Sequence, residues 1–165
     1  MWLASAEIRS SLLSVMKPIF LSALLALVAA APQAHAHCQV PCGIYDDNNV
    51  IQSMHTDYVT IAKAAKQIEE LSKDPSANAH QLTRWINNKE SHAQAIQEKV
   101  LNYFLAQRLK VDQPDRETYL KNLQLCHEVI VTAMACKQST DEAKVTKLHD
   151  LLKDFSAAFG TKTGK

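Results

Sequence analysis

Apolar residues recur every three or four positions along most of the chain after residue 47. This spacing places them on one face of an α-helix. The pattern predicts helices over roughly 48–73, from Pro75 to near Leu109, around 119–134 and over 145–159. In the first helix the apolar positions are Val50, Ile51, Met54, Tyr58, Ile61, Ala62, Ala65, Ile68 and Leu71. Four amphipathic helices with short loops predict an all-α fold, an antiparallel four-helix bundle.

Polar residues at the predicted helix ends support these boundaries. Asp46-Asp47-Asn48-Asn49 is suited to begin the first helix, because Asp and Asn side chains accept hydrogen bonds from free amide groups. Asp74-Pro75 ends this helix and begins the second, with Asp as N-cap and Pro in the first turn. Ser139 and Glu142 have the spacing of a capping box, so Ser139 is expected to cap the fourth helix.

A different pattern marks residues 1–36. Residues 18–31 form a long apolar run, shorter than the roughly 20 residues that span a bilayer. Lys17 precedes the run and Ala34-His35-Ala36 follows it, which is typical of a Sec-type signal peptide. We therefore expect signal peptidase to cut after Ala36 and the protein to be periplasmic or secreted. The alternative is an uncleaved membrane anchor.

Composition agrees with a helical domain and narrows the class of partner. The 165 residues include three Gly and five Pro, few for the many turns of an all-β fold. The 18 Lys and Arg balance 17 Asp and Glu, which gives no indication of a nucleic-acid partner or an anionic membrane surface. After cleavage we expect one bundle domain, residues 46–165, with no membrane attachment.

The residues after the expected cleavage site carry the candidate chemistry. With His37 first, its amine and imidazole, the Cys38 amide and thiolate, and the Cys42 thiolate lie close together in the chain. Pro41 and Gly43 suit the turn that brings Cys42 back. Two nitrogens and two sulfurs in a plane favour Ni(II) or Cu(II), whereas zinc prefers a tetrahedral site. Thiolate and amidate donors also make Ni(III) accessible, which suggests redox chemistry on a very small substrate.

The motif His-Cys-x-x-Pro-Cys-Gly-x-Tyr, at residues 37–45, resembles the nickel hook of nickel superoxide dismutases. We call residues 37–45 the hook. The resemblance implies disproportionation of superoxide to dioxygen and hydrogen peroxide by a Ni(II)/Ni(III) cycle, one nickel ion per subunit and a homohexamer of four-helix bundles. It assigns His37, Cys38 and Cys42 as nickel ligands, and Tyr45 as the residue that limits anion access. Tyr103 is similar to a second tyrosine of the family.

The chain differs from the family pattern near the hook. Gln39 stands where an Asp is common, and Asp47 replaces the Pro that often follows Tyr-Asp. In the family, the axial imidazole is held by a Glu on the first helix and an Arg on the second. The nearest positions here are Gln52 and His92, which cannot form that ion pair. Because surrounding groups orient metal ligands, we expect the His37 imidazole to be supported differently.

Other interpretations of the hook stay open at the level of sequence. It could bind nickel or copper without catalysis, as a periplasmic metal-binding protein. Alternatively, Cys38 and Cys42 could form a small disulfide in an exported structural bundle.

Outside the hook, most chemistry-bearing residues are expected to be structural. Cys126 and Cys136 are ten residues apart, about 15 Å along a continuous helix and beyond disulfide reach. We expect buried thiols there, or a pair formed across a helix break. The histidines lack a metal-ligand spacing, although His55 and His92 are candidates for facing the hook. Trp85 and the tyrosines other than Tyr45 are expected in the core.

Overall fold

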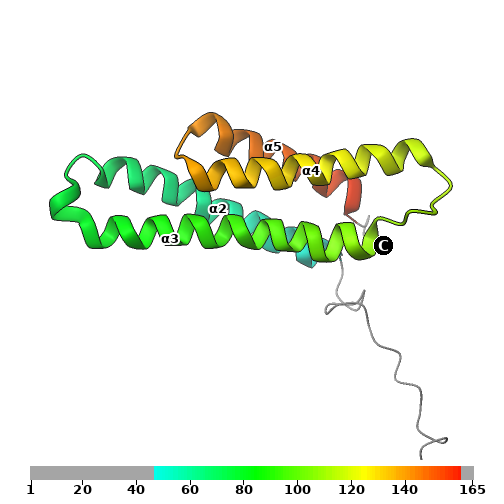
Figure 1. The fold of residues 1–165 in the computed structure, drawn as a ribbon, viewed down its shortest axis with the longest axis horizontal. Helices are drawn as coiled ribbons and strands as arrows, with labels where there is room; N and C mark the ends of the chain where they lie inside the picture. Colours follow the sequence, from blue (N-terminus) through cyan, green and yellow to red (C-terminus); the bar gives the residue numbers. More distant parts are fainter. Residues whose placement is uncertain (1–46, 161–165) are drawn as a thin grey trace, which may run out of the picture. The chain divides into compact units, whose positions relative to one another are not determined.

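The computed structural model describes residues 47–160 (Figure 1). They form α2 (Asp47–Leu71), α3 (Pro75–Lys99), the π-helical segment η1 (Val100–Arg108), α4 (Arg116–Gln138) and α5 (Glu142–Phe159). Within residues 47–160 there is no strand. Because η1 continues α3 directly, the elements amount to four helices, which confirms the predicted all-α four-helix bundle. The expected signal peptide and the hook residues His37, Cys38, Cys42 and Tyr45 lie outside the described residues.

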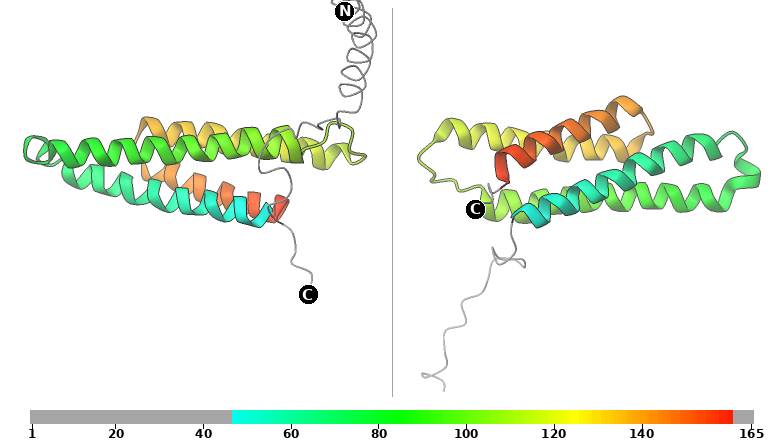
Figure 2. Two further views of the ribbon diagram at one scale, coloured as in Figure 1. Left: turned by 90° about the horizontal axis from the view of Figure 1, so that it is seen from below. Right: turned by 180° about the vertical axis from the view of Figure 1, so that it is seen from behind.

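The helices pack in sequence order, and α5 returns to pack against α2 (Figure 2). Successive helices run antiparallel (Figure 1). The hairpin of α2 and α3 extends beyond the turn between α4 and α5 (Figures 1 and 2). None of the helices in the described part of the chain is long and apolar enough to cross a membrane.

The core lies where all four helices overlap. Its larger fully buried side chains are Met54, Ile61, Ile96, Val100, Phe104, Val129, Leu148, Leu152 and Phe155. Burying side chains of this size stabilises a fold by roughly 1.5–3 kcal/mol each. On α2 the buried Ile51, Met54, Ile61 and Ala65 all occupy positions of the predicted apolar face, which is therefore confirmed.

The expected core position of Trp85 is wrong. Trp85 is only partly buried and lies outside the core cluster, with Lys63 Nζ 5.6 Å from its ring centroid. The neighbouring Ile86 is 42 % exposed. Both residues lie in the first half of α3, before Lys89, which contacts the C-terminal end of α4. Their apolar spacing therefore does not place them in the core.

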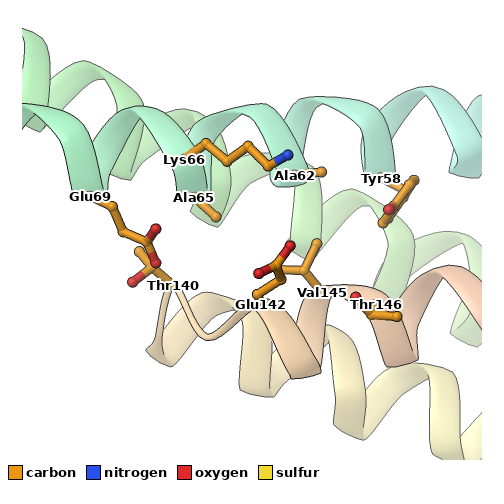
Figure 3. Close-up of a pocket in the computed structure, with 9 residues that line it drawn as sticks. All are labelled: Tyr58, Ala62, Ala65, Lys66, Glu69, Thr140, Glu142, Val145 and Thr146. Atoms are coloured by element: carbon orange, nitrogen blue, oxygen red, sulfur yellow. The ribbon is translucent and has the colours of Figure 1, made fainter.

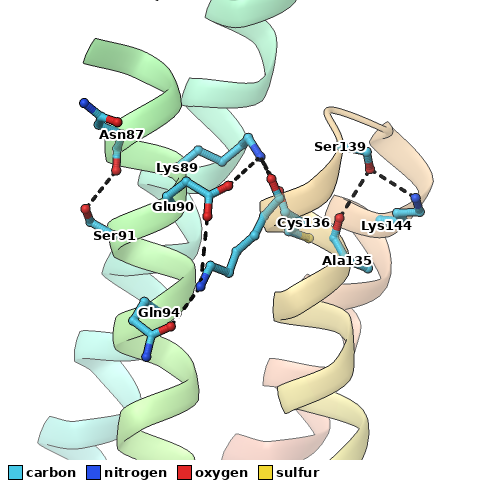
Figure 4. Close-up of polar contacts among 10 residues, drawn as sticks. Asn87, Lys89, Glu90, Ser91, Gln94, Ala135, Cys136, Ser139 and Lys144 are labelled. Carbon is cyan, nitrogen blue, oxygen red and sulfur yellow. Dashed lines mark hydrogen bonds and ion pairs between the residues drawn. The ribbon is translucent and has the colours of Figure 1, made fainter. Parts of the chain in front are cut away.

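The structure confirms one predicted helix cap and corrects another. Asp74 caps α3 as expected, accepting a hydrogen bond from Ala77 N at 3.2 Å. The N-cap of α5 is Asp141, whose carboxylate accepts from Ala143 N at 2.9 Å. Ser139 is instead the C-cap of α4, and its hydroxyl donates to Ala135 O at 3.3 Å (Figure 4). The predicted capping box fails because the Ser139 hydroxyl is engaged with the preceding helix.

A buried lysine joins α3 to the C-terminus of α4 (Figure 4). The Lys89 side chain is 4 % exposed, and its Nζ donates to Cys136 O at 2.6 Å and to Lys137 O at 2.5 Å. The last carbonyls of a helix have no partner within the helix and carry partial negative charge. Burial lowers the pKa of Lys89, an effect that the nearby Glu90 opposes. Lys89 thus acts as a side-chain cap for α4.

Candidate metal centre

The first helix of the bundle begins shortly after the hook in the sequence. Asp47, the first residue of α2, follows Tyr45 by two positions. Its carboxylate is buried, with 5 % of the residue exposed. Tyr103 Oη donates to Asp47 Oδ1 at 2.6 Å, while Arg108 donates to Oδ2 from Nε at 3.0 Å and from Nη2 at 2.5 Å. We call Asp47, Tyr103 and Arg108 the Asp47 cluster.

The π-helical geometry of η1 explains how Tyr103 and Arg108 reach one carboxylate. Leu109 N donates to Phe104 O at 2.8 Å, a bond across five residues. In an α-helix, side chains five positions apart point about 140° apart around the axis. The wider turn of a π-helix brings such side chains close to one face. The sequence predicted a continuous helix to near Leu109 and missed this change, because the apolar spacing alone does not reveal it.

Aromatic packing supports the same end of the bundle. Phe104 packs against Phe155 at 4.6 Å and Phe159 at 5.0 Å between ring centroids, and its centroid lies 5.0 Å from that of Tyr103. Phe104 and Phe155 are fully buried. Edge-to-face aromatic pairs add roughly 0.5–1.5 kcal/mol beyond the area they bury. These aromatic rings therefore anchor η1 to α5 beneath the start of α2.

The end of α5 also comes close to the first turn of α2. A Cβ atom at Gly160 would lie 2.4 Å from Ser156 O and 3.3 Å from Asn48 Oδ1. A larger residue at position 160 would collide with the Ser156 carbonyl of α5 itself, and it would also crowd the Asn48 side chain of α2. We refer to the start of α2, η1 and the end of α5 together as the hook end of the bundle.

A second buried carboxylate lies further along α2. Asp57, 7 % exposed, accepts from His92 Nδ1 at 2.7 Å and from Lys99 Nζ at 2.5 Å, both on α3. We call Asp57, His92 and Lys99 the Asp57 cluster. Gln52 is exposed, and His92 contacts Asp57. The first and second helices are thus joined by acid–base contacts that the sequence analysis missed. The sequence signal for these contacts was Asp57, an acidic residue that lies among Met54, Tyr58 and Ile61 on the apolar face.

His55 contacts the neighbouring helix α5. Its Nε2 forms a 2.9 Å hydrogen bond with Ser156 Oγ. Nearby, the rings of Tyr58 and His149 stack with centroids 4.7 Å apart. Burial lowers the pKa of His55, and the charge of His149 lowers it further. In residues 47–160, His55 and His92 thus make contacts that hold helices together.

The helices offer no set of nickel donors. Within residues 47–160, no group of three or more His, Cys, Asp or Glu side chains could hold a metal ion. Cys126 and Cys136 are free and fully buried, as expected for structural thiols. Burial raises the pKa of Cys126 to about 12 and that of Cys136 to about 11. Since the thiolate is the metal ligand, these two thiols are poor donors.

A small cleft lies between α2 and the beginning of α5 (Figure 3). It encloses about 150 Å³ and is lined by Tyr58, Ala62, Ala65, Lys66, Glu69, Thr140, Glu142, Val145 and Thr146. The lining contains neither Cys nor His, so this cleft provides no soft or imidazole ligand for a transition metal.

The fold thus defines an all-α bundle whose described helices supply packing and ion pairs but no group of side chains that could hold a metal ion. A family model described as nickel-containing superoxide dismutase matches residues 32–162, a range that includes the hook and all four helices. The chain belongs to this family, so it is an oxidoreductase that acts on superoxide and uses nickel. Comparisons with curated proteins and with solved structures found no match.

Proposed function

We propose that the hook, residues 37–45, is the nickel site at which this chain disproportionates superoxide. The observation that carries the proposal is the burial of the other thiols. The chain has four cysteines, and Cys126 and Cys136 lie buried with raised pKa values. Cys38 and Cys42 are the remaining sources of thiolate, which a planar nickel site with access to Ni(III) requires. Family membership favours catalysis over simple nickel or copper storage.

Each hook residue has a distinct role in this proposal. His37 would bind through its amine and its imidazole, Cys38 through its amide nitrogen and thiolate, and Cys42 through its thiolate. Bound there, nickel would supply one-electron reduction and oxidation through a Ni(II)/Ni(III) cycle, which the anionic donors and the imidazole would make accessible. Tyr45 limits the access of other anions. Overall, two superoxide radicals and two protons give dioxygen and hydrogen peroxide.

Maturation is part of the proposed mechanism. The His37 amine is free only after cleavage behind Ala36, because in the precursor the same nitrogen belongs to a peptide bond. We therefore propose that signal peptidase creates the metal site during export to the periplasm or beyond.

The test is to purify the exported protein, determine its first residue, and measure bound nickel and superoxide loss. We expect a chain that begins at His37 with one nickel per subunit. The double variant Cys38→Ser, Cys42→Ser should lose both nickel and activity. Cys126→Ala is the matched control, and should keep both despite some loss of stability. A mature chain that begins before His37, or an active double variant, would contradict the proposal.

We also propose that subunits associate through α4, as part of the expected homohexamer. One face of α4 exposes Leu120, Leu123, Val131 and Met134, which are 37–51 % exposed. Their spacing is symmetric about the exposed His127. In an antiparallel pair with a second copy, Leu120 would therefore meet Met134 and Leu123 would meet Val131. Pairing of this kind is isologous, as two-fold contacts require.

A charged side chain introduced on this apolar face tests the pairing. Val131→Glu should reduce the molar mass of the assembly in light scattering. Val59→Glu, at an exposed apolar position on α2, is the matched control and should leave the mass unchanged. An unchanged mass in Val131→Glu would exclude this face as a contact.

A further inference from the structure

We propose that the Asp47 cluster positions the nickel hook by fixing the first turn of α2 against η1. The inference rests on the proposed function, in which residues 37–45 hold the metal. Asp47, Tyr103 and Arg108 are positioning residues here, because they act on the hook through the backbone that leads into it.

The Asp47 cluster lies next to the hook along the chain. Only Asp46 separates Tyr45 from Asp47. Two residues of fully extended chain span about 7 Å at most. A fixed Asp47 therefore limits how far Tyr45 can lie from the start of α2, whatever conformation the intervening peptide adopts. Loss of that constraint would enlarge the region open to Tyr45 and to the ligands before it.

Both oxygens of the Asp47 carboxylate are held. Tyr103 donates to Oδ1, and Arg108 donates two N–H groups to Oδ2, so the carboxylate cannot rotate without losing a bond. Charge-assisted bonds of this kind are stronger and more directional than neutral ones. A buried carboxylate that leaves its partners must also bear the cost of desolvation. The start of α2 is therefore fixed in position and in rotation.

The donors of the Asp47 cluster are themselves rigid. Tyr103 is buried, and the adjacent Phe104 packs among Phe155 and Phe159. Arg108 is the last residue of η1, whose π-helical turn brings it to the same carboxylate as Tyr103. π-Helical turns are rare and frequently occur at functional sites. The start of α2, which follows the hook in the sequence, is thus joined to the aromatic part of the core.

The Asp57 cluster provides a matched control within the same protein. Asp57 is about as buried as Asp47, lies on the same helix, and likewise accepts hydrogen bonds from two side chains of the neighbouring helix, His92 and Lys99 of α3. It differs in being ten residues further from the hook, about 15 Å along α2. A general loss of bundle stability should follow from disrupting either cluster, whereas an effect on the metal site should follow from only one.

The experiment compares Asp47→Asn with Asp57→Asn in the exported, nickel-loaded protein. Three quantities are measured: the thermal midpoint, the rate of nickel loss to a chelator, and the electron paramagnetic resonance spectrum of the oxidised protein. We expect both variants to lower the midpoint. Asp47→Asn should also release nickel about tenfold faster or more, the scale seen when residues that orient ligands are removed, and should alter the spectrum. Asp57→Asn should leave the release rate and the spectrum unchanged.

Two further variants keep the result decisive. Tyr103→Phe removes the hydroxyl that donates to Asp47 Oδ1 and keeps the ring, so it tests the cluster even if Asp47→Asn does not fold. The double variant Cys38→Ser, Cys42→Ser tests the hook itself. If that variant retains nickel, the proposed metal site is wrong, and the positioning role falls with it. With the hook established, parental nickel release and spectrum in both Asp47→Asn and Tyr103→Phe would overturn the inference. Equal changes in Asp57→Asn would overturn it as well.

Discussion

The two ends of the bundle each bury a charge, and they satisfy it in different ways. At the hook end, the Asp47 carboxylate is held by the charged Arg108 and by Tyr103. At the opposite end, the Lys89 ammonium is held mainly by two neutral carbonyls at the C-terminus of α4. The first contact fixes where a helix begins, and the second fixes where a helix ends.

Side-chain packing also differs between the two ends of the bundle. At the hook end the aromatic cluster joins η1 to α5, and all four helices meet there. At the other end α2 and α3 extend past the turn between α4 and α5, which leaves Trp85 partly buried. The comparison teaches that this chain concentrates its packing at the end nearest the hook. Three experiments test the contrast, in order of decreasing expected effect.

Removing one aromatic ring at each end should lower the free energy of unfolding by different amounts. Phe104→Ala is expected to lower the free energy of unfolding by about 3–5 kcal/mol, because it leaves a cavity among packed rings. Trp85→Ala should cost less than half as much, since its ring packs against fewer neighbours. Urea unfolding of the two variants measures the difference. Equal losses would show that the α2–α3 hairpin is as well packed as the hook end.

Removing the buried cation should weaken the bundle without affecting the metal. Lys89→Met leaves Cys136 O and Lys137 O without their donor, which we expect to cost about 2 kcal/mol. Lys153→Met removes an exposed lysine on α5 and should change the free energy of unfolding by less than about 0.5 kcal/mol. Nickel release should be unaltered in both variants. Faster nickel release in Lys89→Met would show that the two ends are coupled.

The smallest expected effect concerns pH near the hook end. Burial and the charge of His149 lower the pKa of His55 from its ordinary value of 6.5. As the pH falls below 6.5, His55 takes up a proton in the unfolded chain before it does so in the folded chain. The folded state is therefore fully stabilised above pH 6.5 and loses stability as the pH decreases toward the folded pKa of His55. His55→Gln should flatten this dependence between about pH 7 and 5, whereas the exposed His80→Gln should not. Thermal midpoints across that range test the expectation, and equal slopes in parent and His55→Gln would contradict it.

The fold could be predicted well because its signal is periodic. The apolar face of α2 gave Met54, Ile61 and Ala65 as core residues, and all three are buried. The unequal lengths of the helices could also have been predicted from the sequence. Helix α5 has 18 residues and α2 has 25, about 27 Å against 38 Å, so α5 cannot cover the whole of α2.

The contacts that support the candidate site could not be predicted from the sequence pattern, for specific physical reasons. The π-helical turn of η1 changes which side chains share a face, and that change leaves no trace in apolar spacing. Asp47 was expected only as part of a helix-cap cluster, whereas its carboxylate binds a segment more than fifty residues away. Hook residues His37, Cys38, Cys42 and Tyr45 were recognisable because they lie within one short segment of the sequence, so no tertiary contact is needed to see their chemistry.

The burial of the two bundle thiols has a consequence for durability. An enzyme of this family releases hydrogen peroxide, which oxidises cysteine through its thiolate form. With pKa values of about 12 and about 11, Cys126 and Cys136 are ionised at neutral pH to no more than roughly one part in ten thousand. Neither is exposed to solvent. Hydrogen peroxide is therefore expected to oxidise these two thiols slowly.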